Sequence, residues 1–390
     1  MPPIYLDYNA TTPLDPAVVE AMLPFLREDF GNPSSAHAYG VRAHEAVDQS
    51  RAQVAALMGA RSEEIVFTGG GSEASNQALK GAVFQKLRGW FGRWVRGAHI
   101  VTTSVEHPAT LQPCEFLKRM GASVTVLPVD KYGVVDLAAA KKAIAKGTTI
   151  VSVMHANNEV GTLEPIRELA EMAHKVGALL HTDAAQSLGK IEVDVNELGV
   201  DLLTLAGHKL YAPKGIGVLY VRKGVTLEPL IHGAGHEGGR RAGTENVPYI
   251  VGLGKACAIA RESLPGATER LRGLRDRLWT KLREALGERV VLNGHPTERL
   301  PNTLNVNFIG QGGADFLKSV PQIAASTGSA CHEGRIDQSP VLCAMRVPPE
   351  IGKGAVRLSV GRFTTEAEVD QAAEILTRAA GAATTRNNGA

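Results

Sequence analysis

Apolar and polar residues follow two different periods along the first half of the chain. Between about residue 64 and residue 221, short apolar runs alternate with segments in which apolar side chains recur every third or fourth position. In one such segment, residues 165–176, the side chains of Ile166, Leu169 and Ala173 fall on one face of a predicted helix. Alternation of strands and helices at this spacing is typical of an α/β domain with a mostly parallel sheet. The apolar runs predict seven strands, at residues 64–68, 98–103, 123–127, 149–153, 178–182, 201–205 and 216–221.

The pattern changes in the second half of the chain. Residues 222–245 are rich in glycine and predict an exposed, ordered loop. A helical period then runs through residues 247–286, with a predicted break near Pro265. Strands near residues 302–308 and 355–359, followed by a final helix, predict a compact α+β unit at the end of the chain.

The length of the chain, 390 residues, suits two domains that share one site. We predict a large domain at residues 15–261 and a smaller α+β domain made of residues 1–14 and 262–390. Lys and Arg number 42 against 40 Asp and Glu, so the net charge is close to zero. Nothing in this balance calls for nucleic acid or an anionic membrane as a partner.

The N-terminus and the cysteines favour a cytoplasmic protein. The first residues, MPPIYLDYNATT, lack the basic start and apolar core of a secretory signal. No apolar run approaches the roughly 18–20 residues that a membrane helix needs. The four cysteines, Cys114, Cys257, Cys331 and Cys343, are too few and too scattered for a disulfide framework. Because there is no C-x-x-C pair and no Cys/His cluster, no metal site is predicted.

Two polar motifs follow predicted strands. Residues 69–73, GGGSE, open a helix, and glycines at a helix N-terminus let backbone N–H groups approach a phosphate. A simple Gly-rich turn explains this motif about as well. Residues 181–186, HTDAAQ, place Asp183 at the carboxyl end of a strand, where parallel sheets bind their ligands. Asp183 alone is equally well explained as a helix N-cap.

A third motif, GHKLY at residues 207–211, places Lys209 between a buried strand and a turn. Desolvation there would lower the pKa of the lysine and free its amine to form a Schiff base, although an arbitrary lysine in a loop is usually just exposed. Pyridoxal phosphate needs a phosphate cradle, a carboxylate for its pyridine nitrogen and a lysine. The three motifs together therefore predict a pyridoxal-phosphate site.

The chain also resembles a known family over nearly its whole length, from YLDYNATTP at residues 5–13 to VRLSVGRFTTEAEVD at residues 356–370. Between these lie, in family order, GNPSSAH, SVEHPA, HANNEVGT, HTDAAQSLGK, GHKLYAPKGIG, RAGTEN and STGSACHEG. These motifs are similar to those of the cysteine desulfurase and selenocysteine lyase family of fold-type-I pyridoxal-phosphate enzymes. The resemblance implies a homodimer with a large cofactor-binding domain.

The resemblance assigns roles around the cofactor. It makes Lys209 the Schiff-base lysine, Asp183 the partner of the pyridine nitrogen, and Gln186 a residue that hydrogen-bonds the ring oxygen. His107 would stack on the ring and carry a proton, although a polar cap beside Pro108 is the simpler interpretation of this histidine. The residues that would hold the phosphate are Gly71, Ser72, His208 and, from a second subunit, Thr244.

The same resemblance supplies the residues that meet the substrate. Asn158 and Arg357 would bind the substrate carboxylate, the latter through a bidentate guanidinium, although Arg357 could instead belong to a structural ion pair. Cys331 lies in the polar, glycine-bearing stretch STGSACHEG, beside His332. A structural cysteine usually has apolar neighbours, whereas an accessible thiol beside a histidine can ionise and act as a nucleophile. Lys209, Cys331 and His107 are therefore the predicted catalytic residues.

Some positions depart from the family pattern or divide its branches. Ser72 stands where Thr is frequent, and Ala206 stands where Ser is frequent, so one phosphate-facing hydroxyl is absent. The Cys331-His332 pair and residues 337–342, DQSPVL, are similar to selenocysteine lyases. The length of the predicted cysteine loop fits desulfurases as well. We favour conversion of L-cysteine to L-alanine, with the sulfur passed to Cys331 as a persulfide and then to an acceptor protein.

Several alternatives stay open from the sequence. The main alternative is a selenocysteine lyase. Two further alternatives are an aminotransferase on the same fold and a sulfur-transfer scaffold that turns over only with a partner. The acceptor and its pathway, such as iron–sulfur cluster assembly, are not specified.

Residues 85–97, QKLRGWFGRWVRG, form an aromatic and basic extension. We favour a lengthened helix end that packs its aromatics on the domain over a partner-docking surface.

Overall fold

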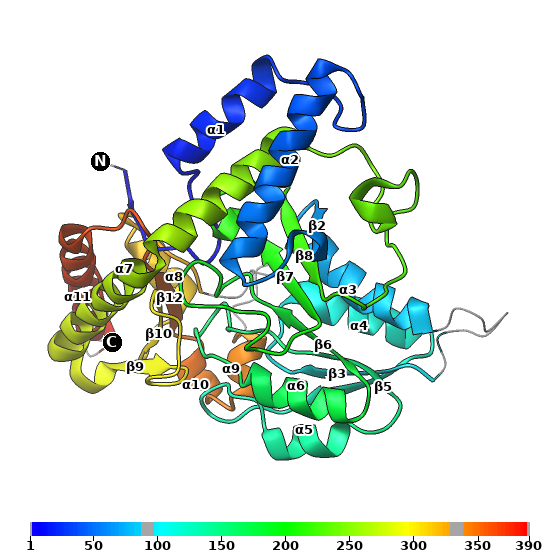
Figure 1. Ribbon diagram of the computed structural model, residues 1–390. Coiled ribbons are helices and arrows are strands. Elements are labelled where there is room, and N and C mark those ends of the chain that lie inside the picture. Colours follow the sequence, from blue (N-terminus) through cyan, green and yellow to red (C-terminus); the bar gives the residue numbers. More distant parts are fainter. Residues whose placement is uncertain (1, 87–94, 96, 328–337, 388–390) are drawn as a thin grey trace.

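The computed structural model describes residues 2–86, 95, 97–327 and 338–387 (Figure 1). A seven-stranded sheet forms its centre, in the order β2-β8-β7-β6-β5-β3-β4. Strand β8 runs antiparallel to both of its neighbours and the other neighbouring pairs are parallel, which confirms the predicted mostly parallel sheet. The strands are β2 (Ile65–Thr68), β3 (His99–Thr103), β4 (Ser123–Leu127), β5 (Thr148–Ser152), β6 (Leu179–Asp183), β7 (Leu202–Ala206) and β8 (Gly217–Val221).

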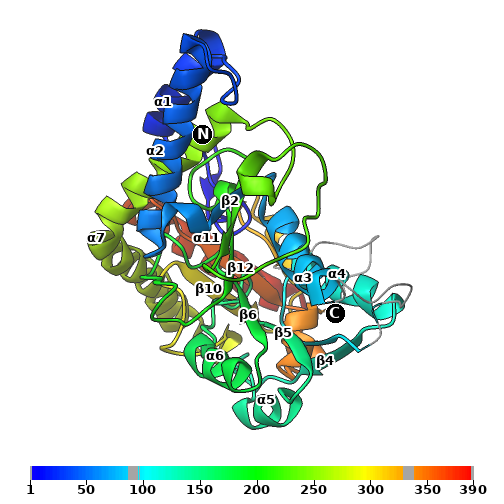
Figure 2. The same cartoon turned by 45° about the vertical axis from the view of Figure 1, so that its right-hand side comes forward.

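Helices cover both faces of this sheet. On one face, α3 (Gly71–Lys86) and α4 (Pro108–Arg119) pack against the strand side chains that point to that face, and together they form one buried apolar cluster. The opposite face packs against α1 (Pro16–Arg27), α2 (Ala38–Leu57), α6 (Ile166–Lys175) and the first half of α7 (Val247–Leu286). Figure 2 shows α3 and α4 on one side and α1, α2 and α7 on the other. Because both faces are buried, the central strands are almost continuously apolar, which is why the sequence revealed them.

A second core lies beside the large sheet. Its three-stranded antiparallel sheet, in the order β12-β10-β9, packs against α11 and the second half of α7. The N-terminal residues Ile4 and Leu6 belong to this core, and β1 (Ile4–Tyr5) pairs in parallel with β11 (Ile323–Ala324). We therefore keep as a proposal the division into residues 15–261 and residues 1–14 plus 262–390. The remaining α-helices and strands of the described residues are α5 (Leu137–Ala143), α8 (Gly313–Ser319), β9 (Val290–Asn293), β10 (Thr303–Phe308), α9 (Pro340–Ala344), α10 (Pro349–Gly352), β12 (Ala355–Ser359) and α11 (Glu366–Asn387).

The predicted break near Pro265 is wrong, because α7 continues through this residue as one helix of 40 residues (Figure 1). Proline removes one helical hydrogen bond and crowds the preceding turn, at a cost of about 3 kcal/mol. Pro265 is exposed, so the freed carbonyl can be solvated, and apolar side chains on each side of it are buried in different cores. Burial at both ends of the helix outweighs the local defect.

Among the described residues, no helix is both long enough and apolar enough to cross a membrane. The aromatic residues and the arginines of the 85–97 extension, Arg88, Trp90, Phe91, Arg93, Trp94 and Arg96, lie outside the described residues. Both interpretations of that extension therefore stay predictions.

Candidate active site

Three of the predicted site residues lie at one edge of the large sheet. Asp183 is the last residue of β6, and Lys209 ends the short turn η2 (Gly207–Lys209) that follows β7. Strand β2 is antiparallel to β8, which is antiparallel to β7, so β2 points the same way as β7 and delivers Gly71 to the same edge. Ligands bind at this edge in open α/β sheets.

Lys209 is half-buried, and its amine is held by the N-terminal segment of the chain. Its Nζ donates to the backbone carbonyls of Asn9 at 2.5 Å and Ala10 at 2.7 Å. Desolvation and, to a smaller extent, the nearby Arg357 lower the pKa of Lys209 to about 8, although Asp183 opposes the shift. A lysine with a depressed pKa is partly unprotonated near neutral pH and is able to attack a carbonyl group.

Asp183 and His107 both interact electrostatically with Lys209. The Asp183 Oδ1 atom accepts the N–H of Ala185 at 2.9 Å, and burial raises the pKa of Asp183 while His107 and Lys209 act against that rise. His107 caps α4, because its Nδ1 accepts the N–H of Ala109 at 3.1 Å. Desolvation lowers the pKa of His107. With Nδ1 occupied as an acceptor, the proton of the neutral ring lies on Nε2.

The N-terminus of α3 provides a cradle for an anion. Gly70 has a φ of 147°, and a Cβ added at Gly71 would approach the Cβ of Ala206 to 3.1 Å. The first helical hydrogen bond joins the N–H of Ala74 to the carbonyl of Gly70. In the described part of the chain, the N–H groups of Gly71 and Ser72 have no acceptor. A phosphate dianion suits these free donors and the positive end of the helix dipole.

Gln186 and His208 complete this side of the site. Gln186 is buried, and its Nε2 donates to the carbonyl of Asn9 at 3.0 Å. The Nδ1 of His208 lies 3.2 Å from the hydroxyl of Thr11, and desolvation lowers the pKa of His208 to about 4. His208 is therefore neutral at pH 7. The amine of Lys209, the carboxylate of Asp183 and the free N–H groups of α3 fit the three chemical requirements of pyridoxal phosphate.

Arg357 already has partners in this structure. Its guanidinium forms an ion pair with Asp7 at 2.9 Å and donates to the backbone carbonyl of Asn158 at 3.0 Å. Arg357 therefore does belong to a structural ion pair. The buried Nε of Arg357 has no partner among the described residues, so one donor is left for another anion. Asn158 meets Arg357 through its backbone, and its predicted contact with substrate stays a prediction.

Asn9 is a site residue that the sequence analysis missed. It connects four segments, because its carbonyl accepts from Lys209 and Gln186, and its side-chain Nδ2 donates to Thr303 at 2.8 Å and to the carbonyl of Asn158 at 3.2 Å. The only available signal was its position inside YLDYNATTP, the first motif of the resemblance. Periodicity gives no weight to a single polar residue in a loop.

The described structure does not test the roles predicted for two further residues. Thr244 is exposed on the Gly-rich stretch, and a contribution to another subunit stays a prediction. Cys331, with its neighbour His332, lies in residues 328–337, outside the described residues. Among the other cysteines, Cys114 in α4 and Cys257 in α7 are buried, and Cys343 in α9 is exposed. Burial raises the pKa of Cys114 to about 12 and that of Cys257 further still, so neither thiol ionises near neutral pH.

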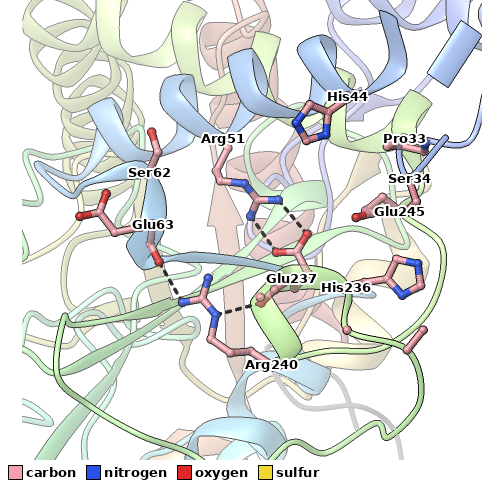
Figure 3. A pocket seen from close by; sticks show the side chains of 13 residues that line it. Pro33, Ser34, His44, Arg51, Ser62, Glu63, His236, Glu237, Arg240 and Glu245 are labelled. Carbon is pink, nitrogen blue, oxygen red and sulfur yellow. Dashed lines mark hydrogen bonds and ion pairs between the residues drawn. The ribbon is translucent and has the colours of Figure 1, made fainter. Parts of the chain in front are cut away.

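A separate pocket of about 530 Å³ opens between α2 and the η3 turn (His236–Gly239) (Figure 3). There Arg51 makes two hydrogen bonds, at 2.7 and 2.9 Å, to the buried Glu237, which also accepts the N–H of Phe67 at 2.9 Å. Arg240 donates to the carbonyls of Glu63 and Ile65. These charges are already satisfied, so we interpret them as anchors that hold the Gly-rich stretch against the sheet.

Comparison with known proteins agrees with this geometry. A model of the family described as Aminotransferase class-V matches residues 4–372. The cysteine desulfurase IscS of Dictyoglomus turgidum is 45% identical over 377 residues, covering 96% of this chain and 94% of the relative. A solved NifS-like protein superposes with a TM-score of 0.88 at 38% identity, covering 98% of this chain and 100% of its own. A solved structure of SspA in complex with cysteine superposes with a TM-score of 0.78 at 34% identity, covering 93% of this chain and 99% of its own.

Proposed function

Since this chain belongs to the class-V aminotransferase family and to its pyridoxal-phosphate-dependent cysteine desulfurases, we propose that Lys209, Asp183 and Cys331 carry the desulfurase reaction. The family relation extends over nearly the whole chain, so the fold is that of the fold-type-I enzymes. The environment of Lys209 is the main support for this assignment. The amine of Lys209 is desolvated at the sheet edge, where it interacts electrostatically with Asp183, and Lys209 comes three residues after Ala206, which approaches Gly71 at the start of α3.

The proposed net reaction is the transfer of one sulfur atom. L-Cysteine and the Cys331 thiol give L-alanine and a Cys331 persulfide, so the C–S bond of the substrate breaks and an S–S bond forms on the enzyme. Atoms and electrons balance without an external oxidant or reductant. A second thiol, on an acceptor protein, would then receive the outer sulfur.

Lys209, Asp183 and the α3 cradle are proposed to hold the cofactor. Gly71 and Ser72 would bind its phosphate with His208, Gln186 would donate to its ring oxygen, and Thr244 would reach the phosphate from the second subunit of a homodimer. When bound, pyridoxal phosphate supplies an electron sink that stabilises negative charge at the substrate Cα. Asp183 would hold the ring nitrogen protonated, which compensates for the burial of its own carboxylate.

The proton steps are assigned to Lys209 and His107. With a pKa of about 8, the amine of Lys209 can accept and return a proton near neutral pH. The neutral ring of His107 presents Nε2, since its Nδ1 is bound to the N–H of Ala109. Asn158 and the free donor of Arg357 would hold the substrate carboxylate.

We also propose L-cysteine as substrate and the cytoplasm as the location of the enzyme. The relative SspA is described in complex with cysteine.

Capture of pyridoxal phosphate by the cofactor-free protein is expected to accelerate as the pH rises and to level off above about pH 8. The unprotonated amine is the attacking form, and burial lowers the pKa of Lys209 from its ordinary 10.5 to about 8. The measurement is the rate of appearance of the visible absorbance band after rapid mixing. A free lysine derivative, as a control, should show a rate that climbs to a midpoint near 10.5. The same midpoint in the protein would contradict the assignment.

The test of the function is the release of alanine by the cofactor-loaded protein from L-cysteine and from L-selenocysteine. A desulfurase is expected to release alanine from L-cysteine in repeated turnovers when a thiol acceptor is present, and only about one equivalent per site without it. Turnover of selenocysteine alone would overturn the desulfurase assignment in favour of a selenocysteine lyase. Alanine that appears only in proportion to an added keto acid would indicate an aminotransferase.

A further inference from the structure

Lys190 is a second buried lysine close to the site. Its side chain belongs to the turn that follows β6, and only 7% of the residue is exposed. Lysine is rarely buried to this degree unless a charged partner lies beside it. Within the described ranges, no carboxylate lies within ion-pair distance of Lys190. Desolvation, Lys209 and Arg357 together lower its pKa to about 7.

Both hydrogen bonds of the Lys190 amine go to a single residue. Its Nζ donates to the backbone carbonyl of Gln186 at 2.9 Å and to the side-chain Oε1 of the same residue at 3.1 Å. Protonated or not, the amine still has hydrogens to donate, so both bonds survive its titration. The contact between the amide oxygen of Gln186 and Lys190 therefore does not require the charged form of the lysine.

This contact determines which end of the Gln186 amide is available to a ligand. With Oε1 bound to Lys190, the Nε2 group donates one hydrogen to the carbonyl of Asn9 at 3.0 Å and has a second hydrogen free. A flipped amide would place Nε2 against the Lys190 amine and Oε1 against the Asn9 carbonyl. The contact with the Asn9 carbonyl would join two acceptors at any pH, and the contact with Lys190 would join two donors whenever its amine is protonated, so the flip is disfavoured.

We propose that Lys190 is a positioning residue that fixes the Gln186 amide, so that Gln186 presents a hydrogen-bond donor, never an acceptor, to the ring oxygen of the cofactor. The inference rests on the proposed cofactor site. A purely structural role would not need an amine here, because the hydroxyl of Thr268 already holds this turn by donating to the carbonyl of Lys190 at 2.8 Å. An apolar side chain would fill the same space without the cost of burying a charge.

The experiment compares Lys190→Met with Thr268→Val in the cofactor-loaded protein. Methionine removes the donor and keeps an unbranched buried stem, whereas Thr268→Val loosens the same turn and leaves the lysine in place. A weaker donor to the ring oxygen makes the neighbouring Schiff-base nitrogen harder to deprotonate. In Lys190→Met, the pH midpoint of the visible absorbance change is expected to rise by about one unit, and the cofactor affinity to fall about tenfold. Thr268→Val should leave the midpoint unchanged.

A double-mutant cycle separates action through Gln186 from a general disturbance. Once Gln186→Met has removed the amide, the further change Lys190→Met is expected to move the midpoint little, because the two residues act as one unit. An unchanged midpoint in Lys190→Met, or shifts that simply add in the double variant, would overturn the inference. Lys190→Leu replaces Lys190→Met if the latter does not fold. If the parent protein itself forms no visible band with the cofactor, the proposed cofactor site fails together with this inference.

Discussion

Lys209→Ala is expected to abolish alanine release, with a loss on the order of a thousandfold or more, and to remove the visible absorbance band of the cofactor-loaded protein. The amine of Lys209 is desolvated at the end of β7 and has a pKa of about 8, so it is available to form a covalent bond to the cofactor. Lys190 cannot replace it, because its amine is committed to Gln186. Absorbance spectra and an alanine assay would measure both effects.

Lys214→Ala is the matched control for this change. Lys214 lies five positions further along the same loop, and its side chain is exposed, so its removal should leave the activity and the absorbance band unaltered. Circular dichroism should show that both variants are folded. An intact absorbance band in Lys209→Ala would mean that another amine holds the cofactor and that the role given to Lys209 is wrong.

Cys331→Ser is expected to reduce alanine release by at least about a hundredfold while leaving the cofactor absorbance unchanged. A serine hydroxyl does not ionise near neutral pH and is a far weaker nucleophile toward sulfur than a thiolate. In the parent protein, mass spectrometry after a short incubation with L-cysteine should find one added sulfur atom on the peptide that contains Cys331. The variant should carry no such addition.

The remaining cysteines provide the control. Cys343→Ser removes the exposed thiol of α9 and is expected to leave turnover and persulfide formation intact. Cys114 and Cys257 are buried with raised pKa values, so they do not substitute for the nucleophile. Sulfur found on Cys343, or full turnover by Cys331→Ser, would contradict the assignment of the sulfur acceptor.

The central sheet was predictable because its strands are buried on both faces and therefore stand out as apolar runs. Lys209 and Asp183 were predictable for a related reason, since each comes directly after such a run and parallel sheets gather their ligands at that edge. The continuity of α7 was not predictable from the sequence. The local effect of a proline can be read from the sequence, but the packing of the two distant helix ends, which opposes it, cannot.

Long-range contacts define the part of the site that the residue pattern did not reveal. Asn9 meets Lys209 and Thr303, which are 200 and 294 positions away in the sequence. No periodicity or spacing encodes such a contact. The proposed roles of Arg357 and Thr244 likewise came from the resemblance, because nothing in their immediate sequence distinguishes a functional contact from a structural one. For Cys331, the polar neighbours and the adjacent His332 gave a further signal.

Because α7 is one continuous helix, the number of its residues between the two cores determines how the cores are oriented relative to each other. Ala260 is the last α7 residue buried in the large core, and Leu271 is the first one buried in the small core. Each residue of a helix adds about 100° of rotation and about 1.5 Å of rise. A single insertion between these two positions would therefore turn the small core by more than a quarter of a circle and carry Arg357 away from the edge where Lys209 lies. Substitutions in this stretch are tolerable in principle, whereas a change in its length is not.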